Sequence, residues 1–174
     1  MSKAEKTRTR YLVVMGIAGT GKTEVGKRLA NALGAAFVEG DNYHCSTNIE
    51  LMRSGTGLTD EHRWPWLHSV CDAALAEDGR TVVIACSVLK RSYRDLLRDR
   101  LGFVRFLYLH GSLQEISARL SQRRGHFASN SLLTSQIETL EPPSRDEDPI
   151  VLDIADTPER IVQRATSLLA DSIR

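Results

Sequence analysis

The stretch GIAGTGKT, from Gly16 to Thr23, contains the residues with the clearest chemical meaning in the chain. It matches the pattern G-x-x-x-x-G-K-[ST], with an additional glycine inside it. Such a loop points successive backbone N–H groups at the phosphates of a nucleotide, and the following helix adds partial positive charge at its N-terminus. The lysine contacts the β- and γ-phosphates and the last hydroxyl binds Mg²⁺. The predicted nucleotide and metal site comprises Gly16, Gly19, Thr20, Gly21, Lys22 and Thr23.

The residues on either side of this loop support a P-loop. Five apolar-rich residues, YLVVM (11–15), precede it, and Val25, Leu29 and Leu33 fall on one face of a helix that follows it. A P-loop requires a strand before it and a helix after it. The alternative, a glycine-rich turn that binds no ligand, does not require either element.

Asp41 is a candidate for chemistry on the acceptor side of the reaction. It follows the second apolar run, AAFVE (35–39). Transfer of phosphate to an alcohol needs a carboxylate that orients the hydroxyl and takes its proton. Because the third apolar run ends VVIACS, without the acid that usually holds Mg²⁺ through water, Asp41 is also a candidate metal ligand. The alternative is that Asp41 caps a turn or the short helix TNIELM.

Further polar residues follow the second and third apolar runs. His44 could hydrogen-bond a polyol or a carboxylate, or it could be structural. Lys90 and Arg91 stand at a predicted helix start, where a cation is unfavourable beside the helix dipole and an anionic substrate would offset that cost. We interpret Arg91, Arg94 and Arg98 individually as an exposed basic face.

The stretch RLSQRRGHF suggests a mobile lid over residues 119–135. Arg123 and Arg124 on such a lid would close over ATP and neutralise charge on the transferred phosphoryl group. Arg119, one turn earlier, could stack on the adenine. A solvated helix end is the alternative for these arginines. Gln136 lies on the next predicted helix, which a proline must end, and could return to the substrate.

Five apolar, β-branched runs must position these residues. Each is followed by a helical or partly helical segment, which predicts an α/β fold with a five-stranded parallel sheet and helices on both faces. Ligands of such sheets bind beyond the carboxyl ends of the strands, where the candidate residues lie. The predicted strands span residues 11–15, 35–39, 81–86, 104–110 and 149–154. We expect residues 1–10 to form a disordered tail and 11–174 a single domain.

Composition limits the class of protein. The chain has 174 residues, 41% of them hydrophobic, and a net charge of +1. This balance gives no global field for nucleic acid or an anionic membrane, and the first apolar run is too short for a membrane span. Three cysteines without C-x-x-C spacing suggest reduced thiols in a cytoplasmic protein. We therefore expect neither a nucleic-acid nor a membrane partner.

Trp66 is interpreted as a core residue rather than a ligand contact.

An ordered set of longer motifs is specific to one family. The chain contains VVMGIAGTGKT, GDNYH, NIELMRSGTGLTDEHRWPWL, CSVLKRSYRDLLR, RRGHF and QIETLEPP in that order. It resembles the gluconokinases, small P-loop kinases related to shikimate and nucleoside-monophosphate kinases. The resemblance implies ATP-dependent phosphorylation of D-gluconate at its 6-hydroxyl. It also implies a cytoplasmic, often dimeric enzyme with a P-loop kinase fold and a mobile lid.

The resemblance also implies roles for individual residues. It assigns the segment 16–23 to ATP and Mg²⁺ and makes Asp41 the leading acceptor-side carboxylate. It implies gluconate or lid contacts for Arg63, Lys90, His126 and Gln136. The chain departs from the family where Cys45 and Gly57 replace prolines and where His62 replaces an aspartate, and these changes bear on the choice of sugar acid.

Three alternative functions have different signatures. A kinase for another small polyol or acid, such as shikimate, would have the same ATP half. A nucleotide-dependent regulator would bind ATP without transfer, but would need neither Asp41 nor arginines on a lid. A nucleic-acid kinase would show a larger basic patch, for which a net charge of +1 gives little support.

Overall fold

The computed structural model describes residues 9–122 and 130–171. Within these ranges the chain forms a parallel sheet of five strands in the order β2-β3-β1-β4-β5. This confirms the predicted α/β fold with a five-stranded parallel sheet. The strands are β1 (Arg10–Met15), β2 (Ala36–Glu39), β3 (Thr81–Ala85), β4 (Val104–His110) and β5 (Ile150–Asp153).

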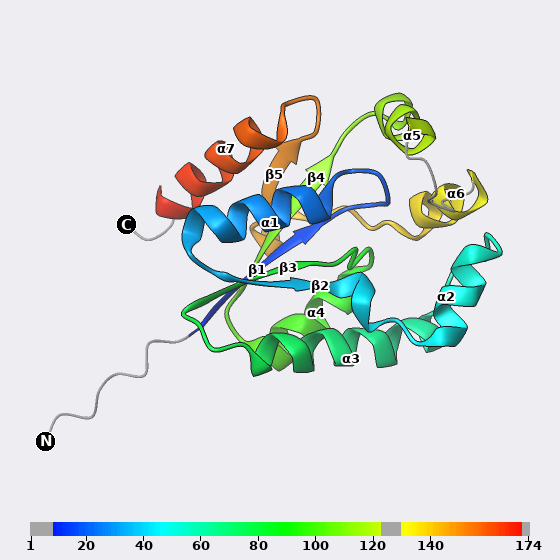
Figure 1. Cartoon of the computed structure of the whole chain (residues 1–174), viewed down its shortest axis with the longest axis horizontal. Helices are drawn as coiled ribbons and strands as arrows, with labels where there is room; N and C mark the ends of the chain where they lie inside the picture. The colour runs from blue at the N-terminus through cyan, green and yellow to red at the C-terminus, as the bar shows by residue number, and fades with distance from the viewer. Residues whose placement is uncertain (1–8, 123–129, 172–174) are drawn as a thin grey trace, which may run out of the picture.

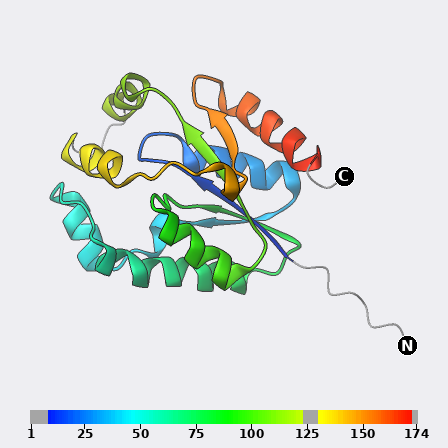
Figure 2. The ribbon, with the colours of Figure 1, turned by 180° about the vertical axis from the view of Figure 1, so that it is seen from behind.

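Helices cover both faces of the sheet (Figure 1). Helices α1 and α7 lie against one face, and α3 and α4 lie against the other, as the view from behind also shows (Figure 2). The helices are α1 (Lys22–Leu33), α2 (Ser46–Arg53), α3 (Asp60–Ala76), α4 (Arg91–Leu101), α5 (Leu113–Gln122), α6 (Asn130–Thr139) and α7 (Pro158–Asp171), with short 3₁₀ turns η1 (Gly40–Tyr43) and η2 (Arg145–Glu147).

The central strand β1 shows why its residues are almost all apolar. Leu12 and Val14 pack into the core beneath α1 and α7, whereas Val13 and Met15 pack into the core beneath α3 and α4. Successive side chains of a strand point to opposite faces, so a strand covered on both sides needs apolar residues at every position.

Strand β1 begins at Arg10, inside the predicted disordered tail of residues 1–10, so the prediction was wrong for this residue. The structure describes the chain from residue 9, and Arg10 is already the first residue of β1, where its N–H donates to the carbonyl of Arg80 at 2.9 Å. Pairing of Arg10 with Thr81 in β3 orders a polar residue that the apolar pattern left out. Residues 1–8 lie outside the described ranges.

Side-chain caps set the beginnings of two helices. Helix α3 begins at Asp60 after Thr59, whose hydroxyl and N–H both contact Nδ1 of His62. Helix α7 begins at Pro158, and the hydroxyl of Thr157 accepts from the N–H of Arg160 at 3.3 Å. A hydroxyl that accepts an otherwise unpaired N–H in the first turn stabilises a helix start.

The expectation of an exposed basic face was wrong for Arg94, which is fully buried. Its guanidinium binds the carboxylate of Glu147 in a bidentate manner, with N···O distances of 2.7 and 2.8 Å. It also donates to the carbonyls of Val88 and Leu89 at 3.1 and 3.2 Å. The acid that makes this burial possible lies in η2, 53 residues further along the chain.

The two neighbouring arginines differ in exposure. The side chain of Arg91 is 47% exposed and pairs with Asp146, as an exposed basic residue would. Arg98 is partly buried and donates to both Asp95 and Glu147.

In the described ranges, no helix combines the length and the apolar character needed to cross a bilayer.

Candidate active site

The loop between β1 and α1 has the backbone geometry of a phosphate cradle. Gly16, Gly19 and Gly21 have φ angles of 146°, 85° and 91°. Only glycine adopts such angles freely. A Cβ atom at Gly16 would lie 2.6 Å from the carbonyl oxygen of Leu109, and one at Gly19 would lie 2.8 Å from Leu120. The predicted strand–loop–helix context is confirmed.

The polar side chains of the loop have different partners. Thr20 is buried, and its hydroxyl donates to the carbonyl of Ile17 at 2.9 Å, so this side chain stabilises the loop itself. The ammonium of Lys22 also donates to the carbonyl of Ile17, at 3.1 Å. The hydroxyl of Thr23 is directed differently and donates to Oε2 of Glu39 at 2.6 Å.

Glu39 is a site residue that the sequence reasoning missed. It ends β2, and its Oε1 accepts the N–H of Asp41 at 3.4 Å while its Oε2 accepts from Thr23. A carboxylate therefore lies beside the hydroxyl that is the expected Mg²⁺ ligand. The available signal was the last position of the run AAFVE, where an acid follows four apolar residues.

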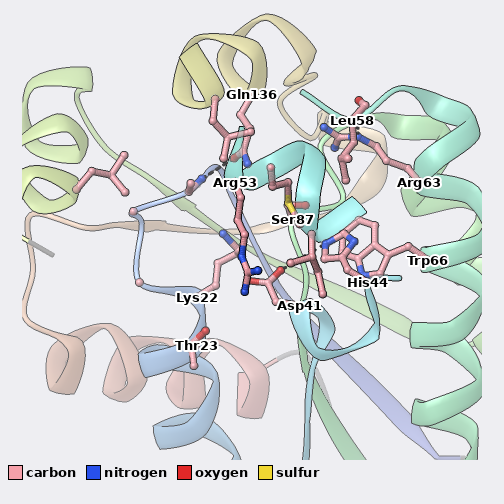
Figure 3. Close-up of a pocket in the computed structure, with 17 residues that line it drawn as sticks. Lys22, Thr23, Asp41, His44, Arg53, Leu58, Arg63, Trp66, Ser87 and Gln136 are labelled. Atoms are coloured by element: carbon pink, nitrogen blue, oxygen red, sulfur yellow. Dashed lines mark hydrogen bonds and ion pairs between the residues drawn. The ribbon is translucent and has the colours of Figure 1, made fainter. Parts of the chain in front are cut away.

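A pocket of about 430 Å³ opens beside the P-loop (Figure 3). Its wall combines residues from the P-loop, η1, α2, α3, the segment after β3, and α6. It therefore joins segments from widely separated parts of the sequence. The predicted site residues whose side chains it brings together are Lys22, Thr23, Asp41, His44, Arg63 and Gln136.

Asp41 and His44 face each other in this pocket. The side chain of Asp41 is 76% exposed, and its Oδ1 lies 3.9 Å from Nε2 of His44, which is buried. Burial lowers the pKa of His44 and favours the neutral ring. The amide of Asn48 approaches Nδ1 of His44 at 3.3 Å. Because an amide nitrogen can only donate, Nδ1 accepts and Nε2 carries the ring proton toward Asp41.

Trp66 holds the loop that contains Asp41. It is only 3% exposed, which confirms its interpretation as a core residue. Its indole stacks on His44 with a centroid distance of 4.2 Å, and its Nε1 donates to the carbonyl of Gly40 at 2.8 Å. Trp66 also lines the pocket, so one side chain both packs in the core and fixes the pocket wall beside His44.

Arg63 brings a buried positive charge to the pocket. It is 4% exposed, its Nε donates to the carbonyl of Leu58 at 3.2 Å, and burial lowers its pKa. No salt bridge to Arg63 occurs within residues 9–122 and 130–171. Because a buried charge is costly without a partner, a guanidinium in this setting favours an anionic ligand.

Lys90 is placed outside the pocket lining. Its ammonium lies 3.0 and 3.1 Å from the two carboxylate oxygens of Asp60, and the hydroxyl of Tyr93 donates to the same carboxylate. These hydrogen bonds lower the pKa of Asp60. The anion that the cation at this helix start was expected to need is thus supplied by the N-terminus of α3.

Two predicted residues contact the region of the P-loop from the C-terminal half of the chain. Oε1 of Gln136, on α6, accepts the N–H of Ala18 at 2.7 Å. Arg119, on α5, donates to the carbonyl of Ile154, and its Nη1 lies 3.9 Å from where a Cβ of Gly21 would be. Arg123, Arg124 and His126 lie outside the described residues.

Comparisons with known proteins identify relatives over most of the chain. A domain family described as AAA domain matches residues 12–143. The thermoresistant gluconokinase of Escherichia coli K12 is 44% identical over 153 residues, which cover 86% of this chain and 87% of the relative. The gluconokinase of Gluconobacter oxydans is 48% identical over 141 residues, 79% of each chain.

Solved structures indicate the same family as these relatives. A gluconokinase from Sinorhizobium meliloti 1021 superimposes with a TM-score of 0.85 and 42% identity over 93% of this chain and 92% of that one. Shikimate kinase from Aquifex aeolicus, at 15% identity and a TM-score of 0.58, shares the fold alone. With a P-loop and Asp41 lining one pocket, and with relatives this similar over most of its length, the chain belongs to the gluconokinase family of P-loop kinases.

Proposed function

We propose that this protein transfers the γ-phosphate of ATP to the 6-hydroxyl of D-gluconate, giving 6-phospho-D-gluconate and ADP. The observation that carries the proposal is the shared pocket, which Lys22 of the P-loop and Asp41 of η1 both line. Close similarity to gluconokinases supports D-gluconate as the acceptor.

On the donor side, the P-loop is shaped to hold the phosphates of ATP. Its three left-handed glycines turn backbone N–H groups toward an anion, and Lys22 adds a full charge. The neighbouring oxygens of Thr23 and Glu39 suit Mg²⁺, which prefers oxygen ligands. When bound, the metal neutralises charge on the phosphates. Thr23 and Glu39 would hold the metal, with Asp41 as the alternative carboxylate.

On the acceptor side, we propose that Asp41 orients the 6-hydroxyl and accepts its proton as the oxygen attacks phosphorus. The Nε2–H of neutral His44 holds a second oxygen of the polyol. Arg63 binds the carboxylate at the other end of gluconate, which provides the anionic partner that its buried charge favours. Gln136 links α6 to the P-loop beside the same pocket.

We also propose the predicted lid arginines as transition-state contacts. Arg123 and Arg124 would neutralise charge on the phosphoryl group, and His126 would contact gluconate. Arg119 already lies beside the P-loop and would contact the nucleotide. Lys90 would act through Asp60, since it is bound to that residue outside the pocket lining.

We propose that the protein is located in the cytoplasm and forms a homodimer. All three cysteines are free, and two of them, Cys71 and Cys86, are buried. Free thiols are usual in a reducing compartment. The dimer is proposed from the resemblance to gluconokinases.

Release of ADP by the purified protein tests the proposed function. The assay supplies MgATP with D-gluconate, with shikimate, with other sugar acids, or with no acceptor. We expect release that depends on D-gluconate. Preference for another acceptor would keep the kinase and change the substrate, whereas folded protein that binds ATP without any acceptor-dependent release would indicate a regulator.

A further inference from the structure

Arg53 is a cation in the pocket that none of the roles above uses. It is the last residue of α2, its side chain is exposed, and it lines the same pocket as Lys22 and Asp41. Figure 3 shows its side chain extending into the pocket, in that view between these two residues. Across residues 9–122 and 130–171, no hydrogen bond or salt bridge involves its guanidinium.

The helix that presents Arg53 is part of the acceptor side. Ile49, Met52 and Arg53 of α2 all line the pocket, which is the i, i+3, i+4 spacing of one helix face. Asn48, in the preceding turn, hydrogen-bonds both His44 and the carbonyl of His62. Helix α2 is therefore fixed against the acceptor-side wall, and its pocket-facing side ends in a positive charge.

A helix C-terminus favours an arginine for reasons unrelated to ligands, because the cation interacts well with the helix dipole. That effect accounts for the charge at the end of α2. It does not account for the direction of the side chain, because an exposed arginine with no partner gains more hydration by extending into bulk water than by lining a pocket.

Among the described residues, Lys22, Arg53 and Arg63 are the cations that line the pocket, and they differ in position. Lys22 belongs to the P-loop and donates to Ile17 within it. Arg63 is buried and held by the carbonyl of Leu58. Of these three, Arg53 combines exposure with a place on the acceptor-side helix, and a planar guanidinium binds phosphate oxygens in pairs.

We infer that Arg53 binds the phosphoryl group after it leaves ATP, as the 6-phosphate of the product. This inference rests on the proposed function. Arg63 then holds the carboxylate of 6-phospho-D-gluconate and Arg53 its phosphate, so the two arginines recognise opposite ends of one molecule. D-gluconate has no phosphate, and its ground-state binding therefore depends little on Arg53.

Binding of 6-phospho-D-gluconate, measured by calorimetry without nucleotide, tests the inference. Charge-assisted hydrogen bonds contribute about 1.5–3 kcal/mol, so we expect Arg53→Met to weaken product binding about 10-fold or more. The KM values for D-gluconate and ATP should change less than about threefold. Arg53→Lys should recover part of the lost affinity, because it restores the charge without the planar fork.

A matched control is Arg164→Met, which changes an exposed arginine on α7 that does not line the pocket. We expect it to leave product binding unchanged. Equal product affinity in wild type and Arg53→Met would overturn the inference while leaving the proposed function intact. If the wild-type protein neither phosphorylates D-gluconate nor binds its 6-phosphate, the proposed function fails and the inference fails with it.

Discussion

Lys22 and Asp41 line one pocket but act on different groups in the proposed reaction, Lys22 on the phosphates of ATP and Asp41 on the acceptor hydroxyl. Lys22→Ala should reduce turnover at least about 100-fold, because the lysine stabilises charge on the transferred phosphate. Asp41→Asn should leave ATP affinity within about twofold and reduce turnover about 10²–10⁴-fold, the usual contribution of a positioned base. Steady-state rates at saturating substrates, together with ATP titrations, separate the two effects.

Asp99→Asn is a suitable control for the Asp41 variant. It makes the same change at an exposed position of α4 that does not line the pocket, and we expect normal turnover from it. Near-normal turnover of Asp41→Asn would instead mean that Asp41 only stabilises the turn in which it lies.

Glu39 leads to a prediction about the metal. If its carboxylate helps to hold Mg²⁺ beside Thr23, Glu39→Gln should raise the Mg²⁺ concentration for half-maximal velocity about 10-fold or more, as losses around metal ligands typically do. The measurement is a Mg²⁺ titration at fixed ATP. Glu50→Gln, an exposed position on α2 that does not line the pocket, is the control. An unchanged Mg²⁺ requirement in Glu39→Gln would transfer the metal role to Asp41.

At the scale of elements, the buried Arg94–Glu147 pair fastens α4 to η2 and to the segment after β3. Burial acts to raise the pKa of Glu147, but hydrogen bonds from Arg94, from the N–H of Ser144 and from Arg98 lower it to about 2. Glu147→Gln leaves Arg94 buried without a counter-charge, and we expect a loss of about 3–5 kcal/mol in the free energy of unfolding at pH 7.

The pH dependence of this loss has a defined sign. Below its ordinary pKa of 4.5, Glu147 takes up a proton in the unfolded chain before it does so in the folded protein. Its stabilising contribution is therefore complete above about pH 4.5 and is lost as the pH falls toward 2. Urea titrations at pH 7 and pH 3 should show a smaller difference between wild type and variant at pH 3.

Glu138→Gln, at an exposed position of α6, provides the control and should change little at either pH. A difference for Glu147→Gln that stays constant between pH 7 and pH 3 would contradict the assignment of the low pKa.

The elements and the site differ in how far the sequence could predict them. Strand positions were predictable because burial on both faces forces continuous apolar runs, and the P-loop was predictable because its backbone geometry demands glycines. The partners of Arg94 and Lys90 were not predictable, since Glu147 and Asp60 lie 53 and 30 residues away and no local periodicity links them. Glu39 was missed because it ends an apolar run.

At the scale of the whole molecule, the pocket exists only when distant parts of the chain have folded together. Residues from the P-loop, η1, α2, α3 and α6 line it, so any ligand of this pocket binds to the native state alone. Such binding must raise the unfolding temperature by mass action. The order of the segments along the chain was readable from sequence, but the way α6 reaches the P-loop through Gln136 was not.

The homodimer is a further prediction at this scale. Light scattering should give a mass about twice the 19.4 kDa of one chain. Among the large exposed apolar residues of the described structure, Phe103 lies between α4 and β4, Leu113 is in α5 and Val151 is in β5. A mass of one chain at micromolar concentration would overturn the dimer and leave the single-chain pocket unaffected.

Because Trp66 stacks on His44 in the pocket wall, its fluorescence can report changes in the pocket. The chain has two tryptophans, and Trp64 packs edge-on against Tyr93, without lining the pocket. A Trp64→Phe variant would therefore leave a single indole, Trp66, in the pocket wall beside His44. If a sugar acid binds beside it as proposed, its emission would report that binding without any nucleotide or coupled enzyme, so rapid mixing could time acceptor binding separately from phosphoryl transfer.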